Sequence, residues 1–306
     1  MDEATTSLGR YVTMEVLRQE VWRRKIADHE QRSSPWVESF RQRKSWRKPH
    51  PIYDFLFEYY KTKLKNFTNW RPMLDMALEG EGAELFLTDG RYHRIDSVVR
   101  LNVRAMIERE RRLVRWVANL VIAALSRPAK FGCFGLHEWA MVYKTKEIRH
   151  ETTPLRPSSE ILEKTVESLP ICCTHYDAFR FFTPNAVPLN TLQPTQEDRE
   201  KNEQFGCVHF NMDLYKWSYK LYPWIGSDLQ MDCFELAIRA RELDMRASPY
   251  DLAAYNMAPI KIETAEGRIE YKREQEALHE KGKALGKRLL GECQKILDQL
   301  ESMKLL

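Results

Sequence analysis

The chain has 306 residues, of which 43% are hydrophobic and 30% are charged, and its 48 basic and 44 acidic side chains leave a net charge of +4. This composition excludes an intrinsically disordered chain. The near-neutral balance gives no general attraction for nucleic acid, so such binding would need a local basic patch. No apolar run reaches the roughly 20 residues that a membrane-spanning helix needs.

The first residues, M-D-E-A-T-T-S-L-G-R, contain early acids and no apolar segment, unlike a secretory signal. The chain has six cysteines and no C-x-x-C pair, which favours reduced thiols. We therefore expect an intracellular protein, of the cytoplasm or the nucleus. The sequence predicts no membrane association and no protein partner.

Residues 1–48 are expected to form a basic N-terminal helical arm. Within 14–48, Arg and Lys alternate with Trp22, Trp36 and Trp46. The segment is therefore either an arm that stacks on bases and neutralises phosphates, or a solvated helix that packs its Trp side chains onto the domain. Pro49 and Pro51 end it, and the main helical domain with the site is expected over 49–271.

The longest helix signal in that domain runs from Asp96 to Ser126, with Arg127-Pro128 as its stop. Arg100 and Arg104 fall near one stripe of this helix, where they would contact phosphate or pair with acidic residues. Those acidic residues belong to a second predicted helix, Asp228–Arg246, in which Glu235 lies on a face of alternating charge.

The C-terminal part combines a short β pattern with a charged helix. Ile260–Thr264 and Arg268–Tyr271 flank Ala265-Glu-Gly267, which predicts a small hairpin, and a C-terminal helix is expected over 272–306. The predicted fold is therefore mainly α, a single helical domain with one small β-hairpin near residues 260–271.

Three stretches combine aromatic with ionisable side chains: Phe131–Tyr143, Cys172–Phe182 and Gly206–Trp217. In each, a Cys precedes a His by two to four residues, and a carboxylate follows within four. Pro-containing segments at 152–159 and 183–200 separate the stretches, so each is expected to reach a shared site on its own element.

One interpretation of these stretches is a metal centre. If Gly206–Trp217 is a helix, His209 and Asp213 share a face, a spacing suited to two metal ligands or to a His oriented by a carboxylate as a general base. A mixed His/carboxylate set would suit zinc or non-haem iron. The candidate ligands are His137, His175, His209, Glu138 and Glu235.

The neighbouring thiols add an alternative within that interpretation. Cys133, Cys173 and Cys207 would join a zinc site or serve as small apolar residues. No spacing matches a named metal motif, since H-E-W-A-M lacks the second His of H-E-x-x-H. Gly-rich phosphate loops and the Gly-x-Ser-x-Gly elbow are also missing from the sequence.

The other interpretation needs no cofactor. Asp213 or Asp177 would be the catalytic carboxylate, stabilising an oxocarbenium-like state or activating water, with His209 as its partner. A flat base would stack on aromatic walls while Arg100 and Arg104 contact phosphates. The candidate substrate-binding aromatic residues are Trp139, Tyr143, Tyr176 and Trp217.

Long blocks of the sequence resemble a family of mainly bacterial sequences named 3-methyladenine DNA glycosylase. The blocks are H-P-I-Y-D-F-L-F-E-Y-Y (50–60), F-G-C-F-G-L-H-E-W-A-M-V-Y (131–143), H-Y-D-A-F-R-F-F-T-P (175–184), N-M-D-L-Y-K-W (211–217), C-F-E-L-A (233–237) and R-E-L-D-M-R-A-S-P-Y-D-L (241–252). The resemblance as a whole extends over most of the chain, roughly Glu15 to Tyr271, and these blocks lie within it.

This resemblance implies hydrolysis of the N-glycosidic bond of a damaged or modified purine without a metal, in DNA or in a purine-containing small molecule. The helix-hairpin-helix segment of the best-known glycosylases of that specificity is missing, so no catalytic residue is carried over from them. Two other hypotheses remain open: a zinc- or iron-dependent enzyme acting on a small aromatic substrate, and a non-enzymatic protein that binds a ligand in an aromatic cavity.

Overall fold

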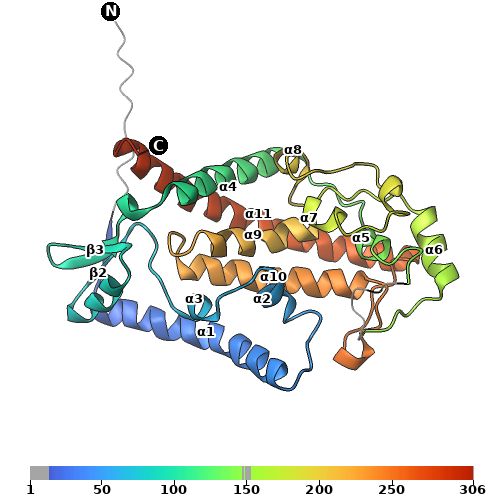
Figure 1. Cartoon of the computed structure of the whole chain (residues 1–306), viewed down its shortest axis with the longest axis horizontal. Coiled ribbons are helices and arrows are strands. Elements are labelled where there is room, and N and C mark those ends of the chain that lie inside the picture. The colour runs from blue at the N-terminus through green and yellow to red at the C-terminus, as the bar shows by residue number, and fades with distance from the viewer. Residues whose placement is uncertain (1–13, 147, 149–152, 306) are drawn as a thin grey trace, which may run out of the picture.

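The structure is a computed structural model that describes residues 14–146, 148 and 153–305. The mainly α fold expected from the sequence is confirmed, with one small four-stranded sheet beside the helices (Figure 1). Residues 1–13 of the predicted N-terminal arm lie outside the described residues. Among the described helices, none is both long and apolar enough to cross a membrane.

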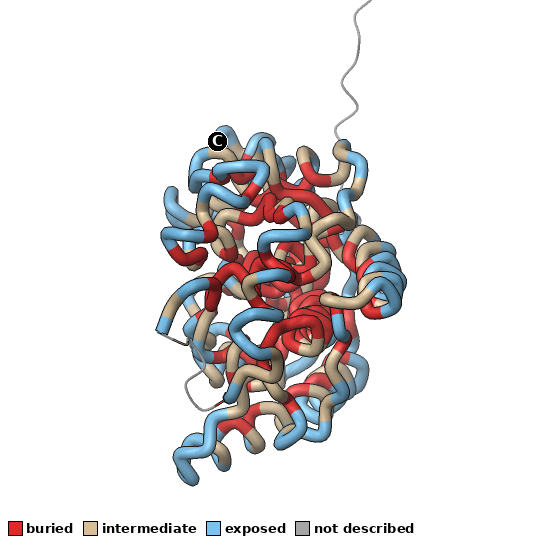
Figure 2. The backbone as a smooth tube through the Cα atoms, turned by 90° about the vertical axis from the view of Figure 1, so that its right-hand side faces the viewer, coloured by how far each residue is buried: buried red, intermediate tan, exposed pale blue. Residues whose placement is uncertain are grey.

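Two central helices, α9 (Val208–Lys220) and α10 (Ser227–Ala247), form the middle of the molecule. The turn at 221–226 brings α10 back alongside α9, and both pack against α11 (Ala265–Ser302) (Figure 1). Figure 2 shows the buried backbone gathered in the centre. Apolar and aromatic residues occur on every side of α9, and most of its residues, including Asp213 and Lys216, are buried.

Outer helices cover this centre with one apolar stripe each. Helix α4 (Glu108–Ser126) buries Val114, Val117 and Val121, spaced three and four residues apart, and packs against α11. Helix α1 (Gln19–Ser45) buries Trp22, Val37 and Phe40 and packs against α10. The basic segment is therefore a helix docked on the domain through its aromatic side chains.

The sheet lies at the end of the molecule that carries the β2 and β3 labels in Figure 1. Its strands are β1 (Glu15–Leu17), β2 (Met76–Glu79), β3 (Tyr92–Ile95) and β4 (Val98–Leu101), in the order β1-β2-β4-β3. Strand β1 is parallel to β2, while β2–β4 and β3–β4 are antiparallel, with Leu78 opposite Val99.

The start predicted for the longest helix was therefore wrong. Asp96 has φ 50° in the turn between β3 and β4, and the β-branched Val98 and Val99 continue as a strand. The helix begins only at Glu108, where Glu110 accepts a hydrogen bond from the backbone N–H of Ile107. Its predicted end at Ser126 is confirmed.

The predicted β-hairpin at 260–271 was also wrong. Thr264 caps α11, because its hydroxyl accepts a hydrogen bond from the backbone N–H of Gly267 at 3.0 Å, so the helix begins at Ala265 rather than at Lys272. A Cβ on Gly267 would collide with the carbonyl of Lys261. Glycine is needed at this position because the start of α11 comes close to the backbone of Lys261. In the sequence, the same glycine between two apolar runs resembles the turn of a hairpin.

Short elements complete the fold and carry most of the site. The short α-helices are α2 (Phe55–Tyr59), α3 (Leu64–Thr68), α5 (Leu136–Ala140), α6 (Ser159–Ser168), α7 (Tyr176–Phe179) and α8 (Arg199–Asn202). The 3₁₀ helices are η1 (Glu81–Thr88), η2 (Val103–Ala105), η3 (Val187–Leu189) and η4 (Ala253–Tyr255). Helices α5, α6 and α7 lie toward the end opposite the sheet (Figure 1).

Candidate functional site

The three Cys/His stretches meet against α10. Phe131–Tyr143 supplies α5, Cys172–Phe182 supplies α7, and Gly206–Trp217 supplies most of α9. Gly135 precedes α5 with φ 77°, and a Cβ there would lie 3.0 Å from the Cβ of Ala247 on α10. This close approach places the short helix α5, with its buried His137 and Glu138, directly beside α10.

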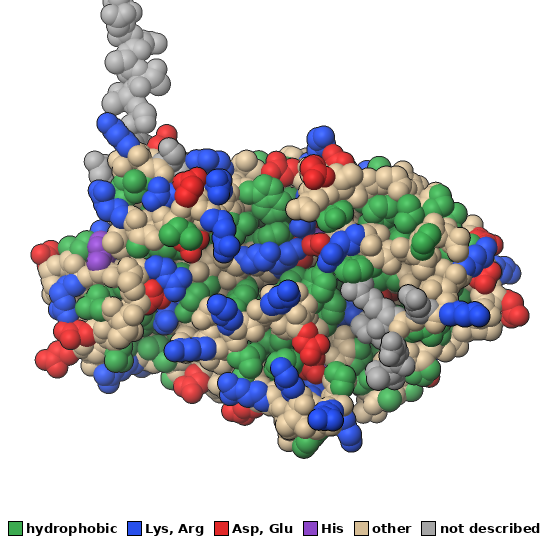
Figure 3. All heavy atoms as spheres, viewed as in Figure 1, with side chains coloured by type: hydrophobic (Ala, Val, Ile, Leu, Met, Phe, Trp, Pro, Cys, Tyr) green, Lys and Arg blue, Asp and Glu red, His purple; other side chains and the backbone are tan. Residues whose placement is uncertain are grey.

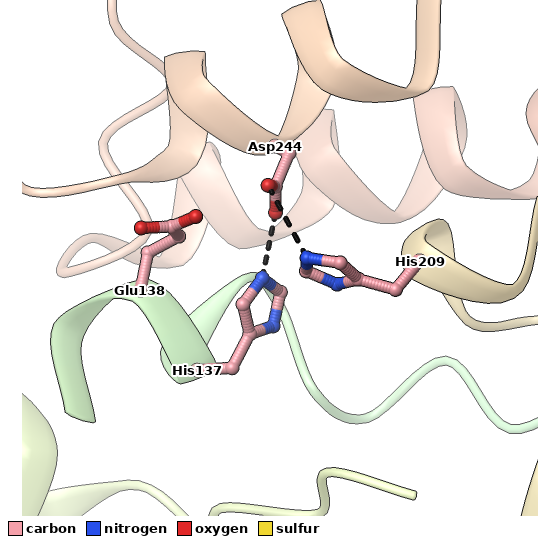
Figure 4. A group of neighbouring side chains, drawn as sticks. All are labelled: His137, Glu138, His209 and Asp244. Atoms are coloured by element: carbon pink, nitrogen blue, oxygen red, sulfur yellow. Dashed lines mark hydrogen bonds and ion pairs between the residues drawn. The ribbon is translucent and has the colours of Figure 1, made fainter. Parts of the chain in front are cut away.

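The first cluster of the site, called here the His137 group, consists of His137, Glu138, His209 and Asp244. Their ligand atoms all lie within 4.8 Å of one another. The Nε2 atom of His137 is 2.6 Å from one oxygen of Asp244, and Nε2 of His209 is 3.7 Å from the other. Figure 4 shows both rings directed at that carboxylate, with Glu138 to one side.

Arg241 holds the two carboxylates of the His137 group in place. Its Nη1 atom donates to Glu138 at 2.9 Å and to Asp244 at 2.7 Å. Its guanidinium also lies 4.1 Å from the ring centroid of Phe55, and the residue is 1% exposed. A buried arginine thus compensates two buried acids, as burial of such charges requires.

The second cluster, called here the His175 group, consists of His175, Glu203 and Asp213. The carboxylate of Asp213 accepts hydrogen bonds from Tyr60 Oη at 2.9 Å, Lys216 Nζ at 3.0 Å and Arg199 Nη2 at 2.8 Å. It also lies 3.3 Å from His175 Nε2. Protein cations therefore already occupy the space around this second set of ligands.

The two groups share one row of imidazole rings. His209 lies between the others, with its ring centroid 4.5 Å from that of His137 and 5.4 Å from that of His175. The Nδ1 atoms of His209 and His175 are buried and have no hydrogen-bond partner.

Protonation follows from burial and from the neighbouring charges. Burial lowers the pKa of His209 to about 3, so this imidazole is neutral near pH 7. Burial also opposes the charge on His137, but Asp244 and Cys133 outweigh it and hold the pKa of His137 well above its ordinary value. Burial and the nearby Asp244 raise the pKa of Glu138.

The charges of the combined site balance when His137 is protonated. Its carboxylates are Glu138, Asp177, Glu203, Asp213 and Asp244, whereas its buried cations are Arg199, Lys216 and Arg241. The imidazolium of His137 supplies a fourth positive charge, and the partly exposed Arg180 supplies a fifth from the surface side of Asp177. A dication that displaced the proton of His137 would keep the charge of the site close to balance.

A cavity of about 30 Å³ opens onto both groups. Its polar floor is formed by Glu138, His175, Asp177, His209, Asp213 and Arg241. Its other lining residues are Phe55, Tyr59, Tyr60, Met141, Ala178 and Phe181. Ionisable groups with shifted pKa values therefore lie beneath a mostly aromatic mouth, an arrangement typical of a ligand or active site.

Cysteines from all three stretches gather behind His137. Cys133, Cys172, Cys173 and Cys207 line, together with His137, a second cavity of about 10 Å³. The Sγ atom of Cys133 lies 3.4 Å from Nδ1 of His137, on the side of the ring away from Asp244. The six cysteines are all free thiols.

The structure brings together six of the predicted site residues. Asp177, Asp213, His209, His175 and Glu138 line the cavity, and His137 lies next to it. The pairing within this set differs from the prediction, because Asp213 contacts His175 and the carboxylate facing His209 is Asp244.

The predicted aromatic walls lie elsewhere in the core. Trp139 is fully buried and donates its indole N–H to the carbonyl of Ala247, and Tyr143 donates its hydroxyl to Glu167. Trp217 packs against Trp116 and Arg199. These described side chains, and that of Tyr176, lie outside the cavity lining, and rings from α2 and from the segment after α7 take their place.

Three predicted charged residues lie outside the site. Glu235 pairs with Arg32 of α1 at 2.9 Å, because it lies on the side of α10 that faces α1. Arg100 is on β4 and Arg104 is on η2, next to the sheet. The error follows from the false helix start, which had placed both arginines on a helix stripe.

Sequence reasoning missed Asp244, Arg241, Arg199 and Glu203 as functional residues. Arg241 and Asp244 are three residues apart within R-E-L-D, and Arg199 and Glu203 are four apart, so each pair shares a helix face or turn. That spacing indicates ion pairs within one helix or turn. No sequence signal tied either pair to the histidines, which lie far away in the chain.

Basic side chains do not form a single patch on the face shown in Figure 3, where Lys and Arg alternate with acidic and hydrophobic residues. No protein-family model, curated protein or solved structure matched the chain.

Proposed function

We propose that the protein is a metal-dependent enzyme in which the His137 group holds one zinc or non-haem iron ion. The observation that carries this proposal is the convergence of two imidazoles and two carboxylates from α5, α9 and α10 within 4.8 Å. Mixed nitrogen and oxygen ligands of this kind suit both ions.

Charge and protonation support the same proposal. A bound dication would take the place of the proton that the high pKa of His137 retains, which keeps the charge of the site close to balance. His209 is already neutral and can donate a lone pair without losing a proton. A metal at this position would supply Lewis-acid chemistry or an activated water.

Other residues of the chain would position the ligands. Arg241 orients Glu138 and Asp244 through hydrogen bonds of 2.9 and 2.7 Å. Cys133 contacts Nδ1 of His137 and so would orient that ring and fix its tautomer.

The mouth of the cavity supports a planar substrate. Phe55 and Tyr59 stack on each other, with ring centroids 4.9 Å apart and 11° between their planes. Phe181, which follows α7, also lines the cavity. Aromatic rings favour stacked contacts with a flat molecule. The substrate class is therefore a small aromatic compound.

Metal analysis of the purified protein tests this proposal. We expect about one zinc or iron ion per chain, because the His175 group is filled by Arg199 and Lys216. His209→Ala should lose most of that metal, since removal of one ligand from a small set strongly weakens binding. His93→Ala, on β3 near the sheet end, is the matched control and should keep it.

The proposal fails if protein produced in zinc- and iron-supplemented medium contains neither metal. It also fails if folded His209→Ala binds as much metal as the control variant. Circular dichroism and a thermal melt of each variant would show that the fold is retained.

A second candidate is the metal-free N-glycosylase implied by the sequence resemblance. The observation that favours it is the carboxylate of Asp213, which lines the cavity below the aromatic mouth. Burial alone would raise its pKa, but Lys216, His175 and Arg199 hold that pKa well below its ordinary value. An ionised carboxylate there would stabilise an oxocarbenium-like state, with Asp177 and His209 beside it and DNA or a purine-containing small molecule as the partner.

Chelation separates the two candidates. Protein treated with EDTA and freed of metal should release no methylated purine from alkylated DNA if the metal is essential. Release of free base at an undiminished rate by the metal-free protein would favour the N-glycosylase and would contradict the first candidate. Chromatography of the released bases provides the measurement.

A further inference from the structure

The cavity of the candidate site is closed to any aromatic molecule in its present form. Its volume is about 30 Å³, which is enough for one or two waters. The lining residues Phe55, Tyr59 and Tyr60 belong to α2 or its end, whereas Asp177, Ala178 and Phe181 belong to α7 or follow it. A planar substrate can therefore enter only if α2 and α7 move apart.

Arg180 joins these two elements across the mouth. Its Nη2 atom donates to the hydroxyl of Tyr59 at 3.1 Å, and its Nε atom lies 3.3 Å from Asp177. The same guanidinium lies 4.3 Å from the ring centroid of Phe181. The side chain is 42% exposed, and it contacts the lining residues Tyr59 and Asp177 from outside the cavity lining.

Asp177 has two cationic partners besides Arg180. Asp177 also contacts Lys216 Nζ at 2.5 Å and Arg199 Nη1 at 3.5 Å, and both of those cations are largely buried. The carboxylate of Asp177 therefore stays compensated when Arg180 leaves it. A partly exposed ion pair contributes little to stability, so departure of Arg180 costs little.

We propose that Arg180 admits and binds a planar aromatic anion at this mouth. The guanidinium leaves Tyr59 and Asp177 and forms hydrogen bonds to a carboxylate or phosphate group of the substrate, and the separated rings of Tyr59 and Phe181 contact its flat body. This inference rests on the proposed function only in taking the cavity as the reaction site.

Binding of simple probes to the full-length protein tests the role of Arg180. The probes are 2-naphthoate, 2-naphthyl phosphate and the neutral 2-naphthamide, measured by isothermal titration calorimetry. At least one anionic probe should bind about tenfold or more tightly than the amide, the scale of hydrogen bonds to a charged group. Arg180→Gln should abolish this difference. A preference for the carboxylate or for the phosphate identifies the kind of anion.

Two further variants sharpen the test. Tyr59→Phe removes the hydroxyl that accepts from Arg180 and leaves the guanidinium in place, so it should bind the anionic probe at least as tightly as the unmodified protein. Arg246→Gln, which breaks an ion pair of similar exposure with Glu270, should leave probe binding unchanged.

Equal binding of the anion and the amide, equal binding by Arg180→Gln and the unmodified protein, or no binding of any probe would each overturn the inference. Metal content measured on the same samples keeps the two proposals distinguishable. Metal-loaded protein without an anion preference overturns only the role of Arg180, whereas metal-free protein that prefers the anion overturns only the metal centre.

Discussion

Asp213→Asn is expected to lower the free energy of unfolding by about 3–5 kcal/mol, the range seen when one partner of a buried ion pair is removed. Asp213 is 2% exposed and compensates Lys216 and Arg199, which themselves lie largely out of water. The amide keeps the shape of the side chain but removes its charge and presents N–H groups to two cations. Urea unfolding followed by tryptophan fluorescence measures the difference.

The same substitution should change how stability depends on pH. The pKa of Asp213 is held well below its ordinary value in the folded protein, so the stability it contributes is present above about pH 4, the pKa of an unfolded aspartate, and is lost as pH falls through the folded value. The Asn variant lacks this contribution and should lose less stability on acidification below pH 4.

Asp198→Asn is the matched control for Asp213→Asn. Asp198 pairs with Lys201, whose side chain is 79% exposed, so solvent screens this pair and its loss should change the stability far less than the loss of Asp213. A loss of stability in Asp213→Asn no larger than that of the control would contradict the buried ion cluster around Asp213.

Gly282→Ala is expected to destabilise the protein by about 1–3 kcal/mol, the usual cost of overpacking a tight interface. A Cβ at Gly282 on α11 would collide with the side chain of Asn211 on α9. Asn211 donates hydrogen bonds of 2.8 Å to the carbonyls of Phe205 and Cys207 at the start of α9. Because His209 lies in the same turn, metal content should fall together with the thermal midpoint.

Gly291→Ala, on the same helix, is the control for Gly282→Ala. A Cβ at Gly291 meets no atom within 4 Å, so the better helix propensity of alanine should stabilise the protein by about 0.5–1 kcal/mol. Equal effects of the two substitutions in a thermal melt would contradict the close contact between α9 and α11.

The sequence predicted the parts of the fold that depend on a strong local pattern. Amphipathic periodicity located α10, and the Arg127-Pro128 stop located the end of α4. The mixed aromatic and ionisable stretch around His209 is a buried helix. Short elements were less predictable, because Val98 and Val99 fit a helix stripe as well as a strand. The hairpin expected at 260–271 failed because Thr264 could act as a helix cap or as a strand end, and only the packed structure distinguishes the two.

The histidines of the site could be predicted from the sequence, whereas their main carboxylate partner could not. The repeated Cys–His–carboxylate pattern pointed to His137, His175 and His209, which form one row. Asp244 could not be tied to them, because its contact with His137 joins residues that are 107 positions apart in the chain. The aromatic lining came from α2 and from Phe181 rather than from the predicted aromatic residues, since Trp139 and Trp217 pack in the core.

X-ray absorption at the metal edge of the purified protein tests the proposed centre most directly, because it reports the kinds of atoms that surround the ion. Ligation by the His137 group predicts nitrogen and oxygen neighbours at about 2.0–2.2 Å and the outer-shell pattern of imidazole rings. The metal signal should be lost in His209→Ala. Sulfur neighbours at about 2.3 Å would place the metal among Cys133, Cys173 and Cys207 instead, and would contradict the centre proposed at Asp244.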